Sequence, residues 1–317
     1  MSANGTVFMF SGQGSQYFHM GRELFDRNDV FRAWMLRLDE GAKSEIGVSV
    51  IAALYDPARG KGDVFDRTLL THPAVYMIEI ALARTLIEAG LKPDLVLGAS
   101  LGSFAAAAVA GAVGIEDGLR AVIRQAQAFE RLCPPGGMTA VMAEPALYEE
   151  PFLRDRGTLA AVNFASHFTV SAALADLDAI ERELKSRNTP HLRLPVSFAF
   201  HSRWIDPARA SYLASVADIP IRAAVLPIAC CERAEVVASL PDGFFWNVAR
   251  EPIRFRETIE RLERDGARRY IDVGPAGTLA TFLKYLLPPT SGSTMRALLT
   301  PYGQDLRNLD ALLAAPA

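Results

Sequence analysis

The chain has 317 residues, half of them hydrophobic, and a formal net charge of -3 at pH 7. This length allows a sizeable core, and the near-neutral charge argues against nucleic acid as a partner. No stretch approaches the ~18 unbroken apolar residues of a membrane span, and the start MSANGTVFMF lacks the basic beginning of a secretory signal. We therefore expect a cytoplasmic protein that does not bind membranes.

Cysteine usage points to neither a disulfide framework nor a metal site. The three cysteines, Cys133, Cys230 and Cys231, are too few for such a framework. No CxxC or HExxH spacing is present. We expect buried free thiols and no bound metal.

The first part of the chain alternates strand-like and helix-like segments. TVFMFSGQGSQ (residues 6–16) is typical of a buried strand that runs into a glycine-rich loop, and residues 21–42 have the apolar spacing of an amphipathic helix. A second helix is expected from Pro73 to Gly90, and a short strand follows in LKPDLVLG, residues 91–98. This order predicts a parallel sheet flanked by helices.

The pattern changes after the helix that carries Gln125. Four short strand-like runs follow, separated by helical stretches such as LADLDAIERELKSR; the runs are MTAVMA, TLAAVNF, FTVSAAL and HLRLPVSF. They indicate a compact β/α lobe inserted at about residues 129–197. The rest of the chain returns to alternating strands and helices, and no repeat or linker divides it into modules.

Residues 98–102 read Gly-Ala-Ser-Leu-Gly, at the predicted turn from strand to helix. A Gly-x-Ser-x-Gly in this place is typical of a nucleophile elbow, whose glycines permit a tight turn that exposes the serine hydroxyl. The following helix would direct free N–H groups at a developing oxyanion. The alternative is that Ser100 merely starts a helix.

A serine nucleophile needs a base, and His201 is the best placed of the five histidines. It ends the apolar run in SFAFHSRW, where a loop residue can meet a cleft. A surface histidine at a strand end is the alternative interpretation.

Five motifs, in this order, resemble the malonyl-CoA:acyl carrier protein transacylase family and the acyltransferase domains of polyketide and fatty acid synthases: FSGQGSQYFHMG, THPAVY, GASLG, AFHS and IDVGPAGTLATFL. The resemblance spans residues 6 to 287. It implies an α/β fold: an α/β-hydrolase-like large subdomain with a parallel sheet, from residues 1–128 and 198–317, and an inserted ferredoxin-like small subdomain, residues 129–197. A cleft between them would hold the site.

The resemblance also implies roles for single residues. Ser100 would be the nucleophile, and His201 its general base and later its acid. A main-chain carbonyl between Asn247 and Glu251 would orient the histidine in place of a carboxylate. The backbone N–H groups of Gln13 and Leu101 would form the oxyanion hole. An ordinary esterase, whose triad includes an acidic residue between serine and histidine, is disfavoured because here the motif QGSQ precedes the serine and a small lobe separates Ser100 from His201.

The sequence departs from the family at position 125. Malonyl-transferring members carry an arginine 25 residues after the serine, and this chain has Gln125 there. A one-residue misalignment would substitute Arg124, but one residue turns a helical side chain by about 100°. A malonyl carboxylate would lose its partner at Gln125, at a cost of about 2–5 kcal/mol. Acetyl and other uncharged acyl groups escape this penalty.

Four further residues are expected to line the acyl pocket. Ala99 replaces the histidine that usually precedes the serine, and His72 and His167 stand where transacylases commonly have glutamine. Phe200 would form the floor of the pocket. Each has a simpler alternative: packing for Ala99, a satisfied surface histidine for the other two, and a core aromatic for Phe200.

These departures resemble the acyl hydrolases of trans-acyltransferase polyketide pathways, which remove stalled acyl groups from carrier proteins. The expected function is a proofreading thioesterase that releases uncharged short acyl groups, such as acetyl, through an acyl-serine intermediate. The alternatives are an acyl-CoA or malonyl-CoA:acyl carrier protein transacylase and a non-catalytic docking module. The expected partner is an acyl carrier protein, with acyl-CoA as another donor. No cofactor is needed beyond the substrate's phosphopantetheine, and we expect a monomer.

Overall fold

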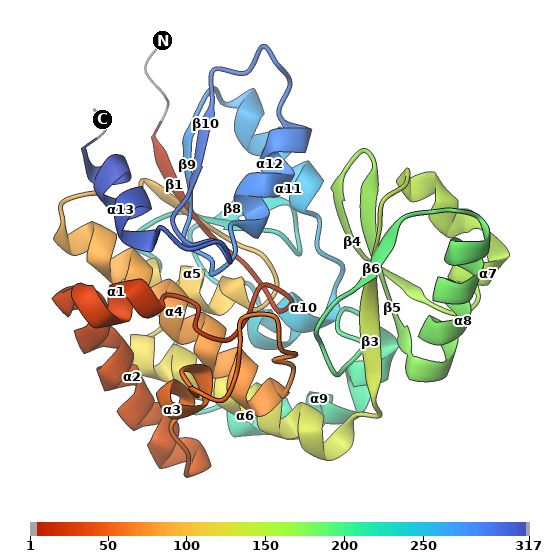
Figure 1. Ribbon diagram of the computed structural model, residues 1–317, viewed down its shortest axis with the longest axis horizontal. Helices are drawn as coiled ribbons and strands as arrows, with labels where there is room; N and C mark the ends of the chain where they lie inside the picture. Colours follow the sequence, from red (N-terminus) through yellow and green to blue (C-terminus); the bar gives the residue numbers. More distant parts are fainter. Residues whose placement is uncertain (1–4, 315–317) are drawn as a thin grey trace.

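The computed structural model describes residues 5–314, and its larger part is built on a six-stranded sheet (Figure 1). Neighbouring strands are parallel except for the last pair, in which β8 is antiparallel to β7. The strands, in spatial order, are β10 (Thr294–Ala297), β9 (Arg269–Asp272), β1 (Thr6–Phe10), β2 (Leu95–Gly98), β7 (Ile228–Cys230) and β8 (Glu235–Val237).

The central strand β1 shows why the sheet needs helices on both faces. Phe8 and Phe10 belong to the largest apolar cluster, whereas Val7 and Met9 pack in a second cluster on the opposite face. A strand with both faces buried is a continuous apolar run, as TVFMF is. The parallel, helix-flanked sheet expected from the sequence is therefore confirmed.

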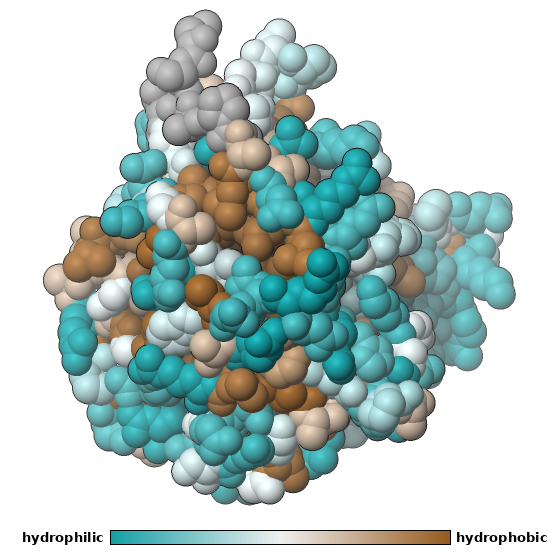
Figure 2. Space-filling model, turned by 60° about the vertical axis from the view of Figure 1, so that its left-hand side comes forward, coloured by the Kyte–Doolittle hydropathy of each residue, from teal (hydrophilic) through white to brown (hydrophobic). Residues whose placement is uncertain are grey.

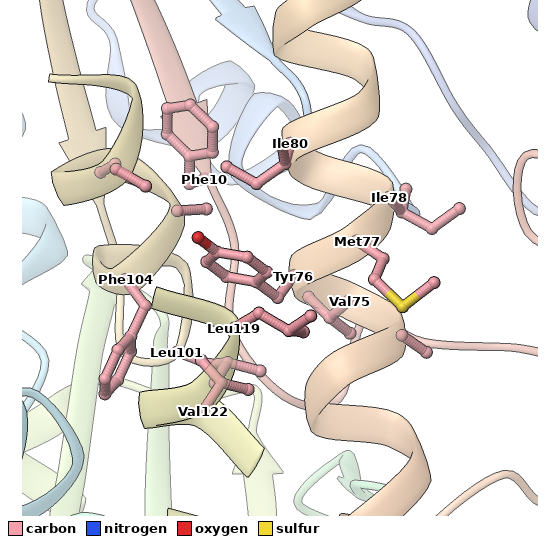
Figure 3. Close-up of a cluster of buried hydrophobic side chains, with 14 of the residues drawn as sticks. Phe10, Val75, Tyr76, Met77, Ile78, Ile80, Leu101, Phe104, Leu119 and Val122 are labelled. Atoms are coloured by element: carbon pink, nitrogen blue, oxygen red, sulfur yellow. The ribbon is translucent and has the colours of Figure 1, made fainter. Parts of the chain in front are cut away.

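Helices on the side of the larger cluster surround α4 (Thr68–Glu88), which is buried along most of its length. Tyr76 of α4 reaches towards Phe10 and the helices α5 and α6 (Figure 3), and its hydroxyl donates to the carbonyl oxygen of Ile115 at 2.7 Å. The helices that pack on it are α2 (Asp29–Ile46), α3 (Val50–Leu54), α5 (Gly102–Val109) and α6 (Ile115–Leu132). Beyond α6 follow α9 (Arg209–Ser215), which contacts α6, and α10 (Phe244–Arg250), which contacts α9.

The remaining helices of this part lie near the sheet's other face and at its edge. α11 (Phe255–Arg264) and α12 (Thr278–Leu286) supply the second apolar cluster, and α13 (Asp305–Leu313) contacts α1 (Arg22–Arg27). None of the helices within residues 5–314 has the length and apolar character needed to cross a membrane. The face seen in Figure 2 is largely hydrophilic, with separate apolar patches.

The smaller part is an antiparallel four-stranded sheet at the right of Figure 1. In spatial order its strands are β4 (Thr158–Phe164), β5 (His167–Ala173), β3 (Gly136–Val141) and β6 (His191–Arg193). The helices α7 (Pro151–Arg154) and α8 (Leu174–Ser186) connect them and share a third apolar cluster. This order of strands is that of a ferredoxin-like split βαβ unit, so the predicted fold class is confirmed.

Three details differ from the sequence expectations. The single helix expected over residues 21–42 is divided into α1 and α2, because Asn28 has an extended backbone and its side chain caps the start of α2. In HLRLPVSF, only residues 191–193 form a strand, because Pro195 has no N–H to contribute to a sheet. The helix expected from Pro73 begins at Thr68, with Pro73 inside it. All four strands of the small sheet lie within residues 129–197, and α6 of the larger part extends to Leu132.

Candidate active site

Ser100 lies in the turn between β2 and α5, with a left-handed backbone (φ 55°). This conformation is strained for a residue with a side chain and is typical of functional turns. A Cβ at Gly98 would lie 2.4 Å from the Cα of Ser103, and one at Gly102 would lie 2.2 Å from the carbonyl oxygen of Phe10. The turn can therefore form only because both flanking residues are glycines.

His201 meets Ser100 although 101 positions separate them in the sequence. The serine Oγ lies 2.7 Å from His201 Nε2, and His201 Nδ1 lies 2.7 Å from the carbonyl oxygen of Glu251. Because a carbonyl can only accept, Nδ1 carries the ring proton and Nε2 is free to accept the proton of the serine. The carbonyl falls within Asn247 to Glu251, as the resemblance implied.

The histidine is held in its neutral form. It is completely buried, and this burial lowers its pKa to about 4; the positive charge of Arg250 acts in the same direction. The bond to the Glu251 carbonyl opposes this shift, but has a smaller effect. A neutral imidazole beside a hydroxyl can serve as a general base near neutral pH.

The loop after β1, residues 12–14, packs against the serine. A Cβ at Gly12 would lie 2.9 Å from the Ser100 Cβ, so only glycine allows this approach. Ser15 Oγ donates to the Gly12 carbonyl at 2.7 Å and thereby fixes the loop. Within residues 5–314, the backbone N–H groups of Gln13 and Leu101 have no hydrogen-bond acceptor, so both are available to an oxyanion.

A cavity of about 240 Å³ opens between the two subdomains at Ser100. Six of the predicted site residues line it: Gln13, Ala99, Ser100, His167, Phe200 and His201. None of the described residues that line it is a lysine, arginine, aspartate or glutamate. Such a site can bind uncharged groups without a desolvation penalty for an unpaired charge.

The pattern of the family described as acyl transferase domain matches residues 7–314. The chain belongs to this family. It is 42% identical over 315 residues to the polyketide biosynthesis acyltransferase homolog BaeD of Bacillus velezensis, covering 98% of this chain and 97% of BaeD. It is 41% identical to the homolog PksD of Bacillus subtilis, covering 96% and 95% of the two chains.

Solved structures of acyl transferases share the fold. A loading acyltransferase from the avermectin modular polyketide synthase has a TM-score of 0.89 and 27% identity, with 98% of this chain and 99% of that chain covered. The protein MCAT from Streptococcus pneumoniae has a TM-score of 0.79 and 25% identity, with 97% of this chain and 99% of that chain covered. The similarity therefore includes both subdomains.

Two predicted pocket residues of this acyl transferase, Gln125 and His72, lie outside the cavity lining, which corrects the sequence expectation. Gln125 is buried, and its Nε2 donates to the Phe245 carbonyl at 3.2 Å, because a buried amide needs partners. His72 is buried against Phe200, with ring centroids 5.5 Å apart. Both residues therefore lie behind the cavity wall.

The alternative residue of the acyl transferase's α6, Arg124, faces away from the cavity. Its guanidinium bonds to the carbonyl of Ser215 and pairs with Asp218 at 2.9 Å. Even if Arg124 rather than Gln125 corresponds to the family's arginine, its guanidinium would not reach the cavity.

The small subdomain contributes a wall that the sequence did not reveal. Met138, Ala140 and Met142 alternate along β3 and its end, so all three face the cavity. Leu192 and Leu194 extend the same apolar wall. The alternation itself was the available signal, but both faces of this sheet carry apolar residues, so the pattern could not identify the cavity side.

His167 stands at the polar edge of this wall. Its Nδ1 lies 3.0 Å from the Nδ2 of Asn163, a cavity residue that the sequence analysis missed. Burial lowers the pKa of His167. The ring packs against Phe282 of α12, with centroids 5.1 Å apart, so this contact joins the two subdomains.

The buried carboxyl group of Glu79 holds Ser11, the residue that precedes the loop of residues 12–14. The backbone N–H of Ser11 donates to Glu79 Oε1 at 2.6 Å. Burial raises the pKa of Glu79 well above its usual value, and the neighbouring Asp272 has its pKa raised to about 6 for the same reason. Glu79 is therefore a neutral hydrogen-bonding group within the core.

Proposed function

We propose that this acyl transferase family member hydrolyses uncharged short acyl groups, such as acetyl, from acyl carrier proteins in polyketide biosynthesis. The observation that carries the proposal is the lack of any charged side chain among the described residues lining the cavity. The curated names of BaeD and PksD, both polyketide biosynthesis acyltransferase homologs, support the pathway assignment.

Charge is the basis of the acyl preference. A malonyl group on Ser100 would bring its free carboxylate into a cavity whose lining includes no cation. Leaving that carboxylate desolvated and unpaired costs about 2–5 kcal/mol. An acetyl or propionyl group carries no such cost. The acyl preference thus depends on the whole lining rather than on Gln125, which lies behind it.

The first half of the reaction forms an acyl-serine. Ser100 Oγ attacks the thioester carbonyl of the acyl-phosphopantetheine arm while its proton passes to His201 Nε2, 2.7 Å away. The N–H groups of Gln13 and Leu101 stabilise the oxyanion, each by about 3 kcal/mol. The C–S bond then breaks, and His201 returns the proton to the departing sulfur.

The second half releases the acid. A water molecule loses a proton to His201 Nε2 and adds to the ester carbonyl of the acyl-serine. The bond from the carbonyl carbon to Ser100 Oγ breaks, and the proton on His201 moves to that oxygen. The free enzyme and a carboxylic acid result. If a second carrier's thiol replaces water, the same steps transfer the acyl group.

Transfer is therefore the second candidate function. The fold similarity to a loading acyltransferase, over nearly the whole of both chains, favours an acyl-CoA or malonyl-CoA:acyl carrier protein transacylase. The two candidates share Ser100 and His201 and differ only in the acceptor.

The deciding experiment loads one carrier protein with acetyl or malonyl and adds a second, unloaded carrier of different mass. Mass spectrometry follows both carriers and the free acids, with Ser100→Ala as the inactive control. We expect acetate release at least about 30-fold faster than malonate release, the ratio that corresponds to 2 kcal/mol, and little acyl on the second carrier. Efficient malonyl movement, or acetyl accumulating on the second carrier, would overturn the hydrolase proposal.

A further inference from the structure

A buried chain of polar groups runs from the Gln13 side chain into the core, away from the cavity. Gln13 Nε2 donates to Thr71 Oγ1 at 2.8 Å and to His72 Nδ1. The Thr71 hydroxyl in turn donates to the Arg67 carbonyl at 3.2 Å, so it accepts from Gln13. The side chain of Gln13 is thus held by α4 while its backbone faces Ser100.

The direction of these bonds determines where the His72 ring carries its proton. Because Nδ1 accepts from Gln13, the proton of a neutral ring must lie on Nε2. The Gln125 side chain also hydrogen-bonds to the ring, and this bond opposes the effect of burial on the pKa of His72. Gln125 Nε2 donates to the Phe245 carbonyl, so its Oε1 is the atom left to accept from His72 Nε2–H.

The His72 ring is neutral at neutral pH, because it is buried among apolar groups. His72 is 2% exposed and packs against Phe129 and Phe200, with centroid distances of 6.3 and 5.5 Å. Burial lowers its pKa to about 3. What matters at neutral pH is therefore which of the two neutral tautomers is present.

We propose that His72 is a positioning residue: its Nε2–H tautomer, fixed by Gln125, holds the Gln13 side chain and thereby the loop that presents the Gln13 N–H to Ser100. The catalytic part of this inference rests on the oxyanion role of Gln13 in the proposed function, whereas the tautomer does not. Residue 125 would then act on the site through His72, without touching the cavity.

The proposal explains how a residue behind the cavity wall could influence the reaction. A guanidinium at position 125 has only donors. Such a donor would face the Nε2–H donor of His72, so it favours the tautomer with the proton on Nδ1. In that tautomer the Nδ1–H would face the Nε2 donor of Gln13. The Gln13 amide would have to rotate, and the loop of residues 12–14 would move with it.

The direct test is the protonation of the ring, measured by ¹⁵N NMR on the full chain with labelled histidine. His72→Gln identifies the signals of His72 by their loss. We expect an unprotonated Nδ1 and a protonated Nε2 in the wild type, and a proton shifted to Nδ1 in Gln125→Arg. A wild-type ring protonated on Nδ1, or a ring unchanged in Gln125→Arg, would overturn the proposal.

Kinetics test the positioning role with acetyl-loaded carrier protein. We expect His72→Ala to lower kcat about 10- to 100-fold with KM within about twofold, because misplaced donors act on the transition state. His72→Gln should restore most of kcat, since its amide can accept from Gln13 and donate to Gln125. His191→Gln is the matched control, because His191 is a partly buried histidine of β6 outside the cavity lining.

The outcomes separate the two proposals. If His72→Gln is as slow as His72→Ala while near-UV circular dichroism shows both to be folded, the positioning role is wrong. If His72→Ala does not fold, the rescue variant and the NMR experiment still decide the matter. An error in the proposed acyl group or acceptor would change the products, but it would leave the wild-type tautomer as stated.

Discussion

The two walls of the cavity are built by different physical means. The wall from the large subdomain holds Ser100 and His201 in left-handed backbone conformations, with φ 55° and 60°, and fixes them by hydrogen bonds. The wall from the small subdomain presents Met138, Met142 and other apolar side chains. Directional bonds fix atoms to within fractions of an ångström, whereas apolar side chains such as methionine adapt their shape. We infer that one wall determines the rate and the other the fit of the substrate.

The largest expected effect on the rate is that of removing the nucleophile on the large-subdomain wall. Ser100→Ala should lower kcat by about 10⁴- to 10⁶-fold, as removal of a nucleophile does in serine enzymes. The melting temperature should stay within about 2 °C, since alanine retains the same backbone strain. Single-turnover mass spectrometry of acetyl-loaded carrier measures the rate. A loss below about 100-fold would mean that Ser100 does not form the acyl intermediate.

The support beneath the large-subdomain wall should matter for stability. Glu79→Ala should lower the free energy of unfolding by about 2–4 kcal/mol, because the buried N–H of Ser11 loses its acceptor. Glu79→Gln keeps an oxygen acceptor and should remain within about 1 kcal/mol of the wild type. Urea unfolding measures both variants.

The pH dependence of the same pair gives an independent check. Because the pKa of Glu79 is raised by burial, the folded chain retains this proton at a pH where the unfolded chain has lost it. Wild-type stability should therefore fall relative to Glu79→Gln as the pH rises above about 4.5. Parallel stability curves for the two proteins would contradict a buried neutral carboxyl.

The next largest effect should be on the pH dependence of the activity, through the general base His201. The neutral ring of His201 is the active form, and its pKa is lowered to about 4, so kcat/KM should remain constant down to that pH and fall about tenfold per unit below it. Arg250→Gln should move the inflection upwards, because the arginine charge helps to lower this pKa. Activity recovered after return to pH 7 controls for unfolding. An inflection near 6.5 would mean that the histidine is solvated.

The smallest effect should come from the apolar wall. Met142→Ala should raise KM about three- to fivefold and leave kcat within twofold, because it removes partly buried contact area without moving a reacting group. Michaelis–Menten kinetics with acetyl-loaded carrier protein give both constants. A fall in kcat as large as that of His72→Ala would remove the distinction between the two walls.

Sequence reasoning recovered what depends on local pattern. The need for glycine at position 98 is local, because its Cβ would meet Ser103, five residues on. Glycine at position 102 is required by the Phe10 carbonyl of a distant strand, so there the motif identified the turn without revealing its cause. The place of His201 at the end of an apolar run made it a candidate base, and the family resemblance then assigned the pairing, since no local rule joins residues 101 positions apart. Glu79 shows the opposite case: burial by distant parts of the chain raises its pKa, against the opposing effect of the bond from the Ser11 N–H, 68 positions away.

Gln125 shows where helical periodicity stops being informative. Counting along α6 identified a side chain on the inward face, and the structure does bury it. Periodicity cannot say which other segment fills the space between that face and the cavity. Phe200 and His72, from distant parts of the chain, lie there, so the predicted pocket residue became part of the second layer.

The contact of Gly102 with the Phe10 carbonyl has a consequence for redesign of this scaffold. A Cβ at position 102 would lie 2.2 Å from the Phe10 carbonyl oxygen, so no residue other than glycine fits where β1 meets the start of α5. Randomised libraries should therefore leave the loop of residues 12–14 and the turn of residues 98–102 unchanged. They should vary the methionines and leucines on the cavity wall of the small subdomain. New acyl scope can be sought there without loss of the reactive geometry.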